Sequence, residues 1–439
     1  MLNAIPLLSQ QKTWSLEDCI TYAIENNIQI KQQVLQTMYQ KNTLELSKLN
    51  LLPTISGQAT HNYSFGRALD ETTYKFTENQ SIQSNSFYVG GSLNLFNGLQ
   101  NYNTIKKNRY QLQASEFDLQ SIKDNISMNI ALAYLQILLN QELVATTDNQ
   151  LQITKQQIEK TRKMYAAGSV AKGNLLQIES QAASEELQLI NFKNQLDLSY
   201  LTLTQMLELE TPEGFIIVAP VIKVDTNTVI TGNVDEIFNQ ALGLRPEIKS
   251  AELNLKVGEF DLKIANGGRS PRLSMSHSFV TRYSDVALKP SAPNEKYTFS
   301  EQLNDNISYG VGFTLSIPIL NGWQVNKNIA NSKLNIENYK YSLEGQKKTL
   351  YKNIQQAYAD AVASLKKFTA SQKAVVSSEE SFRYTEQKFN VGMVTPVDYN
   401  AAKTQLLNAQ SDMAQAKYEF VFKTKVLDFY KGLPLTLNQ

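Results

Sequence analysis

Two segments without helix-breaking residues constrain this sequence most. The first lies between Gly98 and Gly168 and contains no proline and no glycine, the residues that most disfavour a helix interior. One helix over this segment would be on the order of 100 Å long at about 1.5 Å per residue, several times an ordinary globular helix. The second segment lies between Gly322 and Gly392 and contains only Gly345. A compact domain has no room for such elements, so the sequence predicts two very long helices.

The two segments belong to an internal duplication. Pro53-Thr-Ile-Ser matches Pro271-Arg-Leu-Ser at an offset of 218 residues. The offset is 224 residues for Asn97-Gly98 on Asn321-Gly322 and for Gly168 on Gly392. A six-residue insertion between Pro271 and Asn321 accounts for the difference. Each half therefore predicts a helix, an alternating segment, a loop, a second alternating segment, a very long helix, a short break and a returning helix.

The predicted division of the chain follows from these matches. Residues 1–15 form an N-terminal extension or the remnant of a signal sequence. The first repeat spans 16–210, with a helix that Ser15 caps and that ends near Leu52, a strand hairpin over 54–96 with a polar loop at 66–85, a long helix over 98–167 and a return helix over 171–209. A linker covers 211–233. The second repeat spans 234–432, with a hairpin over 272–318, a long helix over 322–391 and a return helix over 397–430, before a tail at 433–439.

Both hairpins consist of segments in which residues alternate in polarity, the pattern of half-buried strands. The less polar positions are Ile55, Ala59, His61, Tyr63, Phe65, Phe87, Val89, Leu93, Leu95, Leu273, Met275, His277, Phe279, Tyr283, Ile307, Tyr309, Val311, Phe313, Leu315 and Ile317. Runs of about 10 to 13 residues with aromatic residues near their ends are long enough to cross a bilayer as tilted strands. An amphipathic hairpin packed on a soluble core is the alternative. Four strands cannot close a barrel with a polar lumen, so the bilayer interpretation requires several chains in one barrel.

Composition excludes several other classes of protein. A formal net charge of +1 provides no field that would attract nucleic acid. The sequence contains no run of 18 apolar residues, so a membrane-spanning helix is not predicted. One cysteine, Cys19, rules out an intrachain disulfide and is expected in the core. Two histidines, His61 and His277, leave little material for metal or triad chemistry, so no enzyme, cofactor or metal site is predicted. The pairs Glu185-Glu186 and Glu379-Glu380 are predicted to lie on solvated helix faces.

The order of these motifs resembles the TolC-like outer-membrane efflux protein family over nearly the whole chain. The motifs that carry the resemblance are Leu52-Pro53, Leu95-Phe96-Asn97-Gly98, Ile317-Pro318-Ile319-Leu320-Asn321-Gly322, and the two helix tips Tyr165–Val170 and Phe389–Asp398. Each motif is weak alone, but their duplication at nearly constant spacing is specific.

The resemblance implies a mostly α-helical protein with a transmembrane β-barrel. Three copies would each give four strands to a twelve-stranded barrel and their helices to a long periplasmic tunnel. Such a protein lies in the outer membrane, in contact with its lipid. It passively conducts substrates of an efflux or type I secretion system, and its partners are a periplasmic adaptor (membrane fusion) protein and an inner-membrane transporter. A soluble coiled-coil scaffold or adaptor without a channel is the alternative function.

The resemblance also implies site residues at the two helix tips. Positions that adaptors contact in the family match Ala167, Gly168, Ser169, Val391, Gly392 and Met393. The alternative is that the glycines only make turns. An acidic residue that narrows the tunnel entrance matches Asp398, while Asn174 stands at the equivalent place in the first repeat. A single ring of three Asp398 carboxylates is therefore implied, although Asp398 could equally cap a helix.

Overall fold

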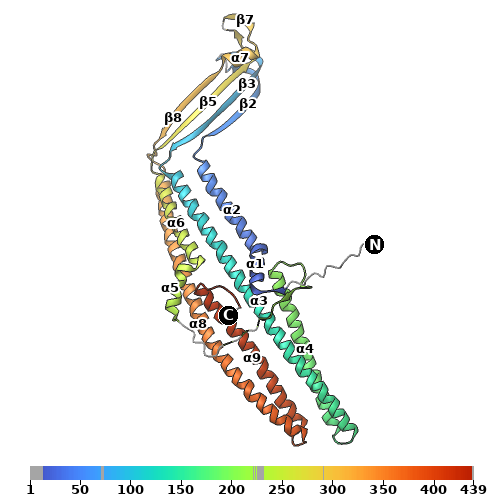
Figure 1. Ribbon diagram of the computed structural model, residues 1–439. Helices are drawn as coiled ribbons and strands as arrows, with labels where there is room; N and C mark the ends of the chain where they lie inside the picture. Colours follow the sequence, from blue (N-terminus) through green and yellow to red (C-terminus); the bar gives the residue numbers. More distant parts are fainter. Residues whose placement is uncertain are drawn as a thin grey trace, which may run out of the picture. The chain divides into compact units, whose positions relative to one another are not determined.

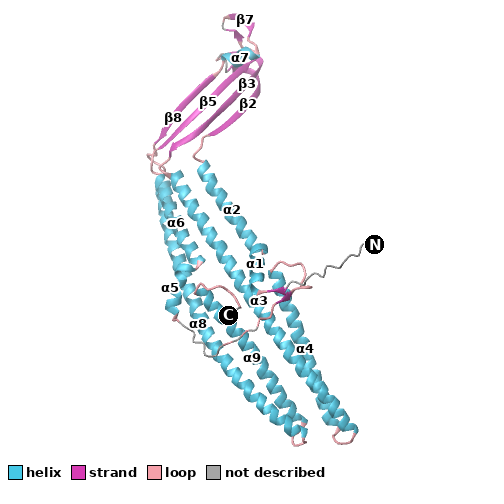
Figure 2. Ribbon diagram, in the orientation of Figure 1, coloured by secondary structure: helices cyan, strands magenta, loops and turns pink. Residues whose placement is uncertain are grey.

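The computed structural model describes residues 13–70, 74–220, 222, 224, 232–289 and 291–437 (Figure 1). Most of the predicted N-terminal extension, residues 1–12, and much of the predicted linker at 211–233 lie outside the described residues. Helices account for most of the described chain, and a four-stranded sheet accounts for most of the strands (Figure 2). No helix in these ranges is both long enough and apolar enough to span a membrane.

The helices of the two halves match one another in length. The first half contains α1 (Leu16–Asn26), α2 (Ile28–Leu49), α3 (Gln100–Ala166) and α4 (Lys172–Met206), and the second contains α5 (Val234–Leu244), α6 (Pro246–Gly267), α8 (Gln324–Asn390) and α9 (Pro396–Tyr430). In both halves these helices have 11, 22, 67 and 35 residues. The two 67-residue helices, α3 and α8, are the elements that the glycine-poor segments predict.

The prediction of one continuous helix from Leu16 to about Leu52 is wrong. Asn27 is extended, with φ −60° and ψ 131°, and separates α1 from α2. Its side-chain oxygen accepts a hydrogen bond from the Gln29 N–H (2.9 Å), and its side-chain nitrogen donates to the Met206 carbonyl (3.2 Å). Arg245 makes the same break between α5 and α6, because Pro246 disfavours a helical conformation at the residue before it. The predicted Ser15 cap of α1 is confirmed, in a capping box with Asp18.

The chain folds into two compact units, and each takes segments from both halves. Unit 1 contains residues 1–36, 116–250 and 344–439, and unit 2 contains 37–115 and 251–343. The long helices α3 and α8 contribute residues to both units.

The core of unit 1 gathers around α1, α3 and α4. Tyr134 on α3 is 1% exposed, and its hydroxyl contacts the carbonyl oxygens of Trp14 (3.1 Å) and Val218 (2.5 Å). Trp14 belongs to the short strand β1 (Thr13–Trp14), and Val218 directly follows the short strand β4 (Ile216–Ile217), which pairs with β1 in parallel. Cys19 is fully buried in the same cluster, as predicted.

Unit 2 contains the four-stranded sheet. Its strands are β2 (Thr54–Asp70), β3 (Lys75–Phe96), β5 (Arg272–Ser284) and β8 (Ser308–Ser316), all antiparallel, in the order β2-β3-β5-β8. The predicted loop at 66–85 is largely wrong, because β2 and β3 continue pairing to Asp70 and Lys75 after a register shift near Gly66. The polar residues of this stretch resemble a loop in composition, but backbone pairing does not require apolar side chains.

The connection from β5 to β8 is not a simple loop either. It contains a small hairpin of β6 (Leu288–Lys289) and β7 (Ala292–Lys296), followed by α7 (Phe299–Asp305). Gln302 of α7 is fully buried, and its side-chain amide bonds to the backbone N–H (2.9 Å) and carbonyl (2.7 Å) of Ser284. These bonds fix α7 to the end of β5.

Candidate functional site: the helix tips

The first tip joins α3 to α4 through a tight reversal at Gly168. The Gly168 N–H donates to the Tyr165 carbonyl (2.9 Å) and the Ser169 N–H donates to the Met164 carbonyl (2.9 Å). These two bonds form a Schellman motif, which requires a left-handed residue at its centre. Gly168 supplies it with φ +74°, a conformation that costs other L-residues about 1 kcal/mol or more.

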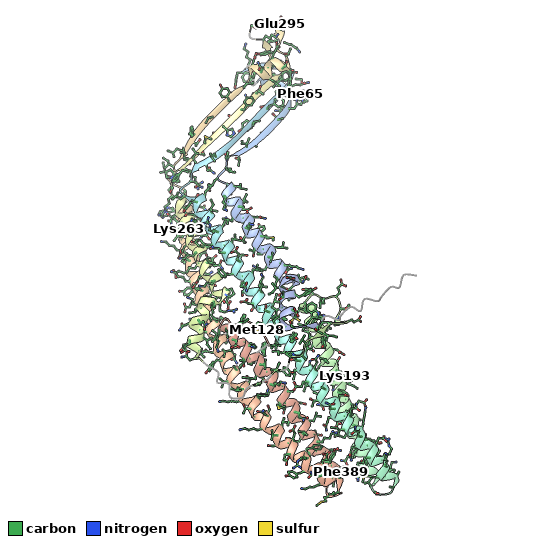
Figure 3. All side chains as sticks on the ribbon, in the orientation of Figure 1. Phe65, Met128, Lys193, Lys263, Glu295 and Phe389 are labelled. Carbon is green, nitrogen blue, oxygen red and sulfur yellow. The ribbon has the colours of Figure 1, made fainter. Side chains whose placement is uncertain are left out.

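The second tip, between α8 and α9, repeats this geometry. The Gly392 N–H donates to the Phe389 carbonyl (3.1 Å), the Met393 N–H donates to the Lys388 carbonyl (2.9 Å), and Gly392 has φ +77°. Figure 3 labels Phe389 at this end of α8. In the part of the chain that the structure describes, a Cβ built on either glycine would meet no atom within 4 Å apart from its chain neighbours. Backbone conformation therefore accounts for both glycines within the chain, and the surrounding space is open.

The two tips border one hollow of about 770 Å³ within unit 1. Five of the eight predicted site residues line it: Ser169, Asn174, Gly392, Met393 and Asp398. The other three, Ala167, Gly168 and Val391, are exposed at the turns beside it. Two apolar side chains are strongly exposed, Val391 at 70% and Met393 at 73%. Lys160 connects the tips by donating a hydrogen bond to the side-chain oxygen of Asn390 (2.8 Å).

Asp398 caps α9. Its carboxylate accepts bonds from the Thr395 N–H (3.1 Å) and hydroxyl (2.7 Å), while the Thr395 hydroxyl accepts from the Asp398 N–H (3.2 Å). These bonds from Thr395 hold the pKa of Asp398 below its usual value. The carboxylate is also exposed and lines the hollow. Asn174 has no such role, because the N-cap residue of α4 is Ala171, which makes no side-chain capping hydrogen bond.

A buried polar cluster lies along the helices behind the tips, and the sequence analysis missed it. Lys403 of α9 and Glu185 of α4 are 1% and 2% exposed and form an ion pair at 3.2 Å. Lys403 also donates to the Gln150 carbonyl (3.2 Å) and to the Thr154 hydroxyl, which in turn bonds to Glu185. The prediction that Glu185 lies on a solvated face is therefore wrong. Burial lowers the pKa of Lys403, and the Glu185 carboxylate opposes that shift.

One signal in the sequence could have indicated this cluster. Four polar residues of α3, Asn140, Thr147, Thr154 and Thr161, follow at intervals of seven, and each is at most 3% exposed. An interval of seven places residues on one packed seam of a helix. Polar residues on a packed seam require polar partners.

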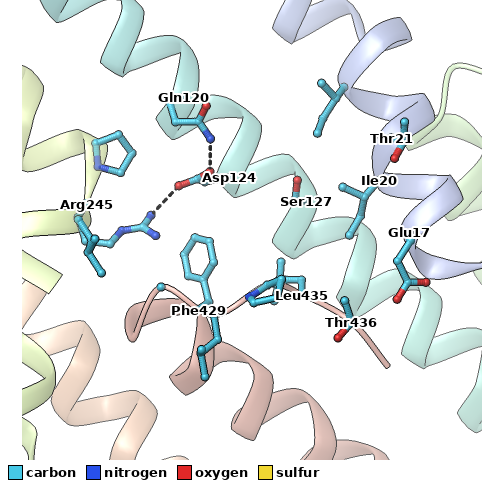
Figure 4. A pocket seen from close by; sticks show the side chains of 16 residues that line it. Glu17, Ile20, Thr21, Gln120, Asp124, Ser127, Arg245, Phe429, Leu435 and Thr436 are labelled. Carbon is cyan, nitrogen blue, oxygen red and sulfur yellow. Dashed lines mark hydrogen bonds and ion pairs between the residues drawn. The ribbon is translucent and has the colours of Figure 1, made fainter. Parts of the chain in front are cut away.

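A second hollow of about 680 Å³ lies in unit 1 where α1, α3 and the end of α9 meet the α5–α6 junction (Figure 4). Arg245 lies there with its guanidinium 3.3 Å from the Asp124 carboxylate and 4.0 Å from the centre of the Phe429 ring. Gln120 donates a hydrogen bond to the same carboxylate (2.7 Å). Burial nevertheless raises the pKa of Asp124. These contacts join the first half of the chain to the second.

Duplicated helical hairpins of this length, attached to a four-stranded antiparallel sheet, define the class of outer-membrane channel proteins. The chain belongs to the outer membrane efflux protein family, whose model matches residues 19–208 and 237–425. It is similar to the outer membrane protein TolC of Salmonella enteritidis, with 23% identity over 394 residues that cover 89% of this chain and 75% of the relative.

Solved structures share the fold. The CusC channel superimposes with a TM-score of 0.81 at 16% identity, covering 98% of this chain and 96% of CusC. The Campylobacter jejuni CmeC outer membrane channel superimposes with a TM-score of 0.80 at 16% identity, covering 98% of this chain and 90% of the CmeC chain. The resemblance noted from the sequence is confirmed. The protein is an outer-membrane exit duct for efflux systems, with a large periplasmic helical part. The soluble-scaffold alternative is not favoured.

Proposed function

We propose that the protein works as a homotrimer in which three copies close one twelve-stranded barrel and line a periplasmic tunnel. Substrates pass through it passively, without catalysis. The tips around Gly168 and Gly392 receive a periplasmic adaptor protein, which links the duct to an inner-membrane transporter. The observation that carries the proposal is the pair of sheet edges, β2 and β8, that the described chain leaves free, while their equivalents β5 and β3 are paired within the chain.

The duplication supports closure by another copy. Strand β3 of the first half pairs with β5 of the second half. The equivalent pair joins β8 to β2, which lie at opposite edges of the chain's own sheet. Only the β2 of another copy can pair with β8, and a free edge in lipid would leave backbone groups unsatisfied. We further propose that 16–210 and 234–432 are the repeats joined by the 211–233 linker, since the family model matches the chain in two corresponding segments.

The apolar face of the sheet supports contact with lipid. Register places the less polar residues of all four strands on one face, for example Val89 beside Phe279 and Phe279 beside Tyr309. Several of these side chains are strongly exposed, including Tyr309 (84%), Phe65 (80%, labelled in Figure 3) and Phe313 (66%). Large exposed apolar surfaces mark contacts with membranes or partners.

Cysteine cross-linking tests the closure. Gly90 pairs with Ser278 across β3 and β5, and the repeat offsets convert this pair into Thr314 on β8 and Thr60 on β2 of the next copy. We expect the variant Thr314→Cys/Thr60→Cys to form covalent trimers on mild oxidation, seen by denaturing electrophoresis. Within one chain the two positions are three strand spacings apart, roughly 14 Å, which is beyond the reach of a disulfide.

Matched variants control this experiment. Thr314→Cys/Ala59→Cys places the second thiol on the opposite face of β2 and should not cross-link. Each single variant controls for the buried Cys19. A double variant that stays monomeric, or that forms covalent species larger than trimers, would contradict closure by three copies.

Two variants separate the charge of Asp398 from its cap. Asp398→Asn removes the charge but keeps an oxygen that can accept from Thr395, so it should weaken cation preference in planar-bilayer conductance. Thr395→Ala removes the cap but keeps the charge, so it should speed hydrogen exchange in the first turn of α9 and leave cation preference unchanged. Unchanged selectivity in Asp398→Asn would rule out the tunnel-entrance role.

The pKa of Asp398 adds a dependence on pH. Because the folded pKa is lowered from 3.8, stabilisation of the first turn of α9 is fully present above 3.8. It is lost only as the pH falls through the lower folded value. Protection against hydrogen exchange, corrected for the intrinsic rate, should follow this course in the parent protein and be absent in Thr395→Ala.

A further inference from the structure

The face of the sheet opposite the apolar one is lined by small polar side chains, which we call the hydroxyl face. Its residues in the regularly paired part of the sheet are Thr54, Ser56, Gln58, Thr60, Asn62, Ser64, Ile82, Ser84, Ser86, Tyr88, Ser92, Asn94, Arg272, Ser274, Ser276, Ser278, Val280, Arg282, Ser284, Ser308, Thr314 and Ser316, with glycines between them. Hydroxyl groups can donate and accept hydrogen bonds without favouring either sign of charge. Any charge on this face therefore dominates its electrostatics.

In the regularly paired part of the sheet, the charges on this face are of one sign. Segments 54–66, 80–96, 272–284 and 308–316 contain no aspartate and no glutamate, and their only lysines or arginines are Arg272 and Arg282. Both arginines belong to β5, where Arg272 pairs with Ser316 of β8 and Arg282 pairs with Ser86 of β3. The register thus places both on the hydroxyl face, one at each end of the strand. Ten residues separate them, roughly 33 Å along a strand.

Neither arginine forms an ion pair with a carboxylate among residues 13–67, 74–76, 81–220, 232–289, 291–292 and 295–437. The carboxylates that follow Arg282 in the chain have other partners. Asp285 accepts a hydrogen bond from the Gln83 N–H (2.8 Å), Glu301 pairs with Lys289 (3.1 Å), and Asp305 accepts from the Tyr297 hydroxyl. Within the described side chains, neither Arg272 nor Arg282 is therefore held in an ion pair.

Arg282 also has a donor without an acceptor. Its Nε is buried and forms no hydrogen bond within the described part of the chain. A buried donor without a partner costs about 1–3 kcal/mol, and an anion would supply the missing acceptor. The guanidinium group suits carboxylates and phosphates in particular, because its planar fork of N–H donors can bond to two oxygens of one carboxylate or phosphate group.

We propose that Arg272 and Arg282 form a filter that makes the strand part of the duct favour anionic solutes. The inference rests on the proposed trimer, in which the hydroxyl face lines the lumen and each arginine position becomes a ring of three positive charges. These rings lie on a part of the wall, segments 54–66, 80–96, 272–284 and 308–316, that contains no carboxylates, and low-dielectric surroundings strengthen their field. Asp398 carries the opposite sign, so the strand part and the tips select in opposite directions.

Ion selectivity in planar bilayers tests the filter. We expect Arg272→Gln/Arg282→Gln to shift the reversal potential in a potassium chloride gradient toward cations, by roughly a threefold change in the anion-to-cation permeability ratio. Arg282→Gln alone should give part of this shift in reversal potential. Arg282→Glu, which reverses the charge, should give a larger shift than Arg282→Gln. The shift should shrink as salt rises, because screening weakens the field.

Two matched variants separate charge from volume. Arg282→Lys keeps the charge and should conserve the selectivity of the parent protein. Ser278→Gln adds a long neutral side chain to the same face and should reduce conductance without changing selectivity. A reversal potential that is the same in the double variant and the parent protein would overturn the filter.

The cross-linking experiment distinguishes failure of the filter from failure of the proposed trimer. Covalent trimers that conduct, but whose selectivity does not respond to the arginines, leave the trimer intact and remove the filter. A protein that neither cross-links between Thr314 and Thr60 nor conducts removes both.

Discussion

Lys403→Met is expected to lower the free energy of unfolding of the helical part by about 3–5 kcal/mol, because it leaves the Glu185 carboxylate buried without its countercharge. Glu185 is 2% exposed, and its remaining partners, Thr154 and Gln181, are neutral. Methionine is similar to lysine in length and fills the space, so loss of packing contributes little. Denaturant unfolding of the purified protein, followed by circular dichroism, measures the loss. Hydrogen exchange should place it in α4 and α9.

Two comparisons identify the buried charge as the cause. The double variant Lys403→Met/Glu185→Leu removes both charges and should recover most of the lost stability, since an apolar pair can replace a buried ion pair at little cost. Lys423 lies on α9, like Lys403, and forms a partly exposed ion pair with Asp360 of α8 (2.7 Å). Lys423→Met removes this pair and should lower the free energy of unfolding by about 1 kcal/mol or less. A double variant as unstable as Lys403→Met would show that the ion pair is not the source.

The same cluster shows the limit of the sequence. Glu185 stands next to Glu186 in a helix rich in glutamine, and local pattern assigns such residues to solvent. Its burial depends on Lys403, 218 residues away, and on which faces of α3, α4 and α9 meet. Helix periodicity does not determine contacts between helices that are distant in sequence. For the same reason, Arg245 and Asp124 could not be paired from the sequence.

Local rules performed best where the backbone itself restricts the residue. Positive φ values recur at equivalent positions of the two halves: Gly98 and Gly322, Leu99 and Trp323, Gly168 and Gly392, and Glu208 and Gly432. The glycine pairs were visible in the sequence as signs of tight turns. Leu99, Trp323 and Glu208 were not, because their side chains do not indicate a left-handed backbone. The extension of β2 and β3 beyond Gly66 was missed because polar strands resemble loops in composition.

Gly98→Ala is expected to destabilise unit 2 severely. Gly98 has φ +68°, and a Cβ there would lie 2.4 Å from the Gly267 carbonyl oxygen and 2.6 Å from the Ser270 Cβ. The left-handed conformation alone costs alanine about 1 kcal/mol, and displacing the backbone at the end of α6 should raise the total to roughly 3 kcal/mol or more. The yield of folded protein and its denaturant midpoint measure the effect. A variant as stable as the parent protein would contradict the close approach of these backbones.

Gly322→Ala is the matched change in the second repeat, and it should impair the assembly of the trimer rather than the folding of the chain. Gly322 has φ +57°, but among the described residues no atom beyond its two chain neighbours lies within 4 Å of a built Cβ. Within the chain the substitution should therefore cost only the conformational term of about 1 kcal/mol. The duplication assigns the place of Gly267 to Leu49 at the end of α2, and the proposed trimer brings the α2 of the next copy to Gly322. When Gly322→Ala is added to the Thr314→Cys/Thr60→Cys variant, the yield of covalent trimers should then fall strongly. The free energy of unfolding of the chain should change little. Closure by neighbouring copies requires that Gly98→Ala strongly lowers both the stability of the chain and the yield of trimers, and that Gly322→Ala lowers the yield of trimers with only the small conformational cost in stability. Normal trimer formation in Gly322→Ala would mean that the neighbouring copy does not approach Gly322 as the repeat symmetry demands.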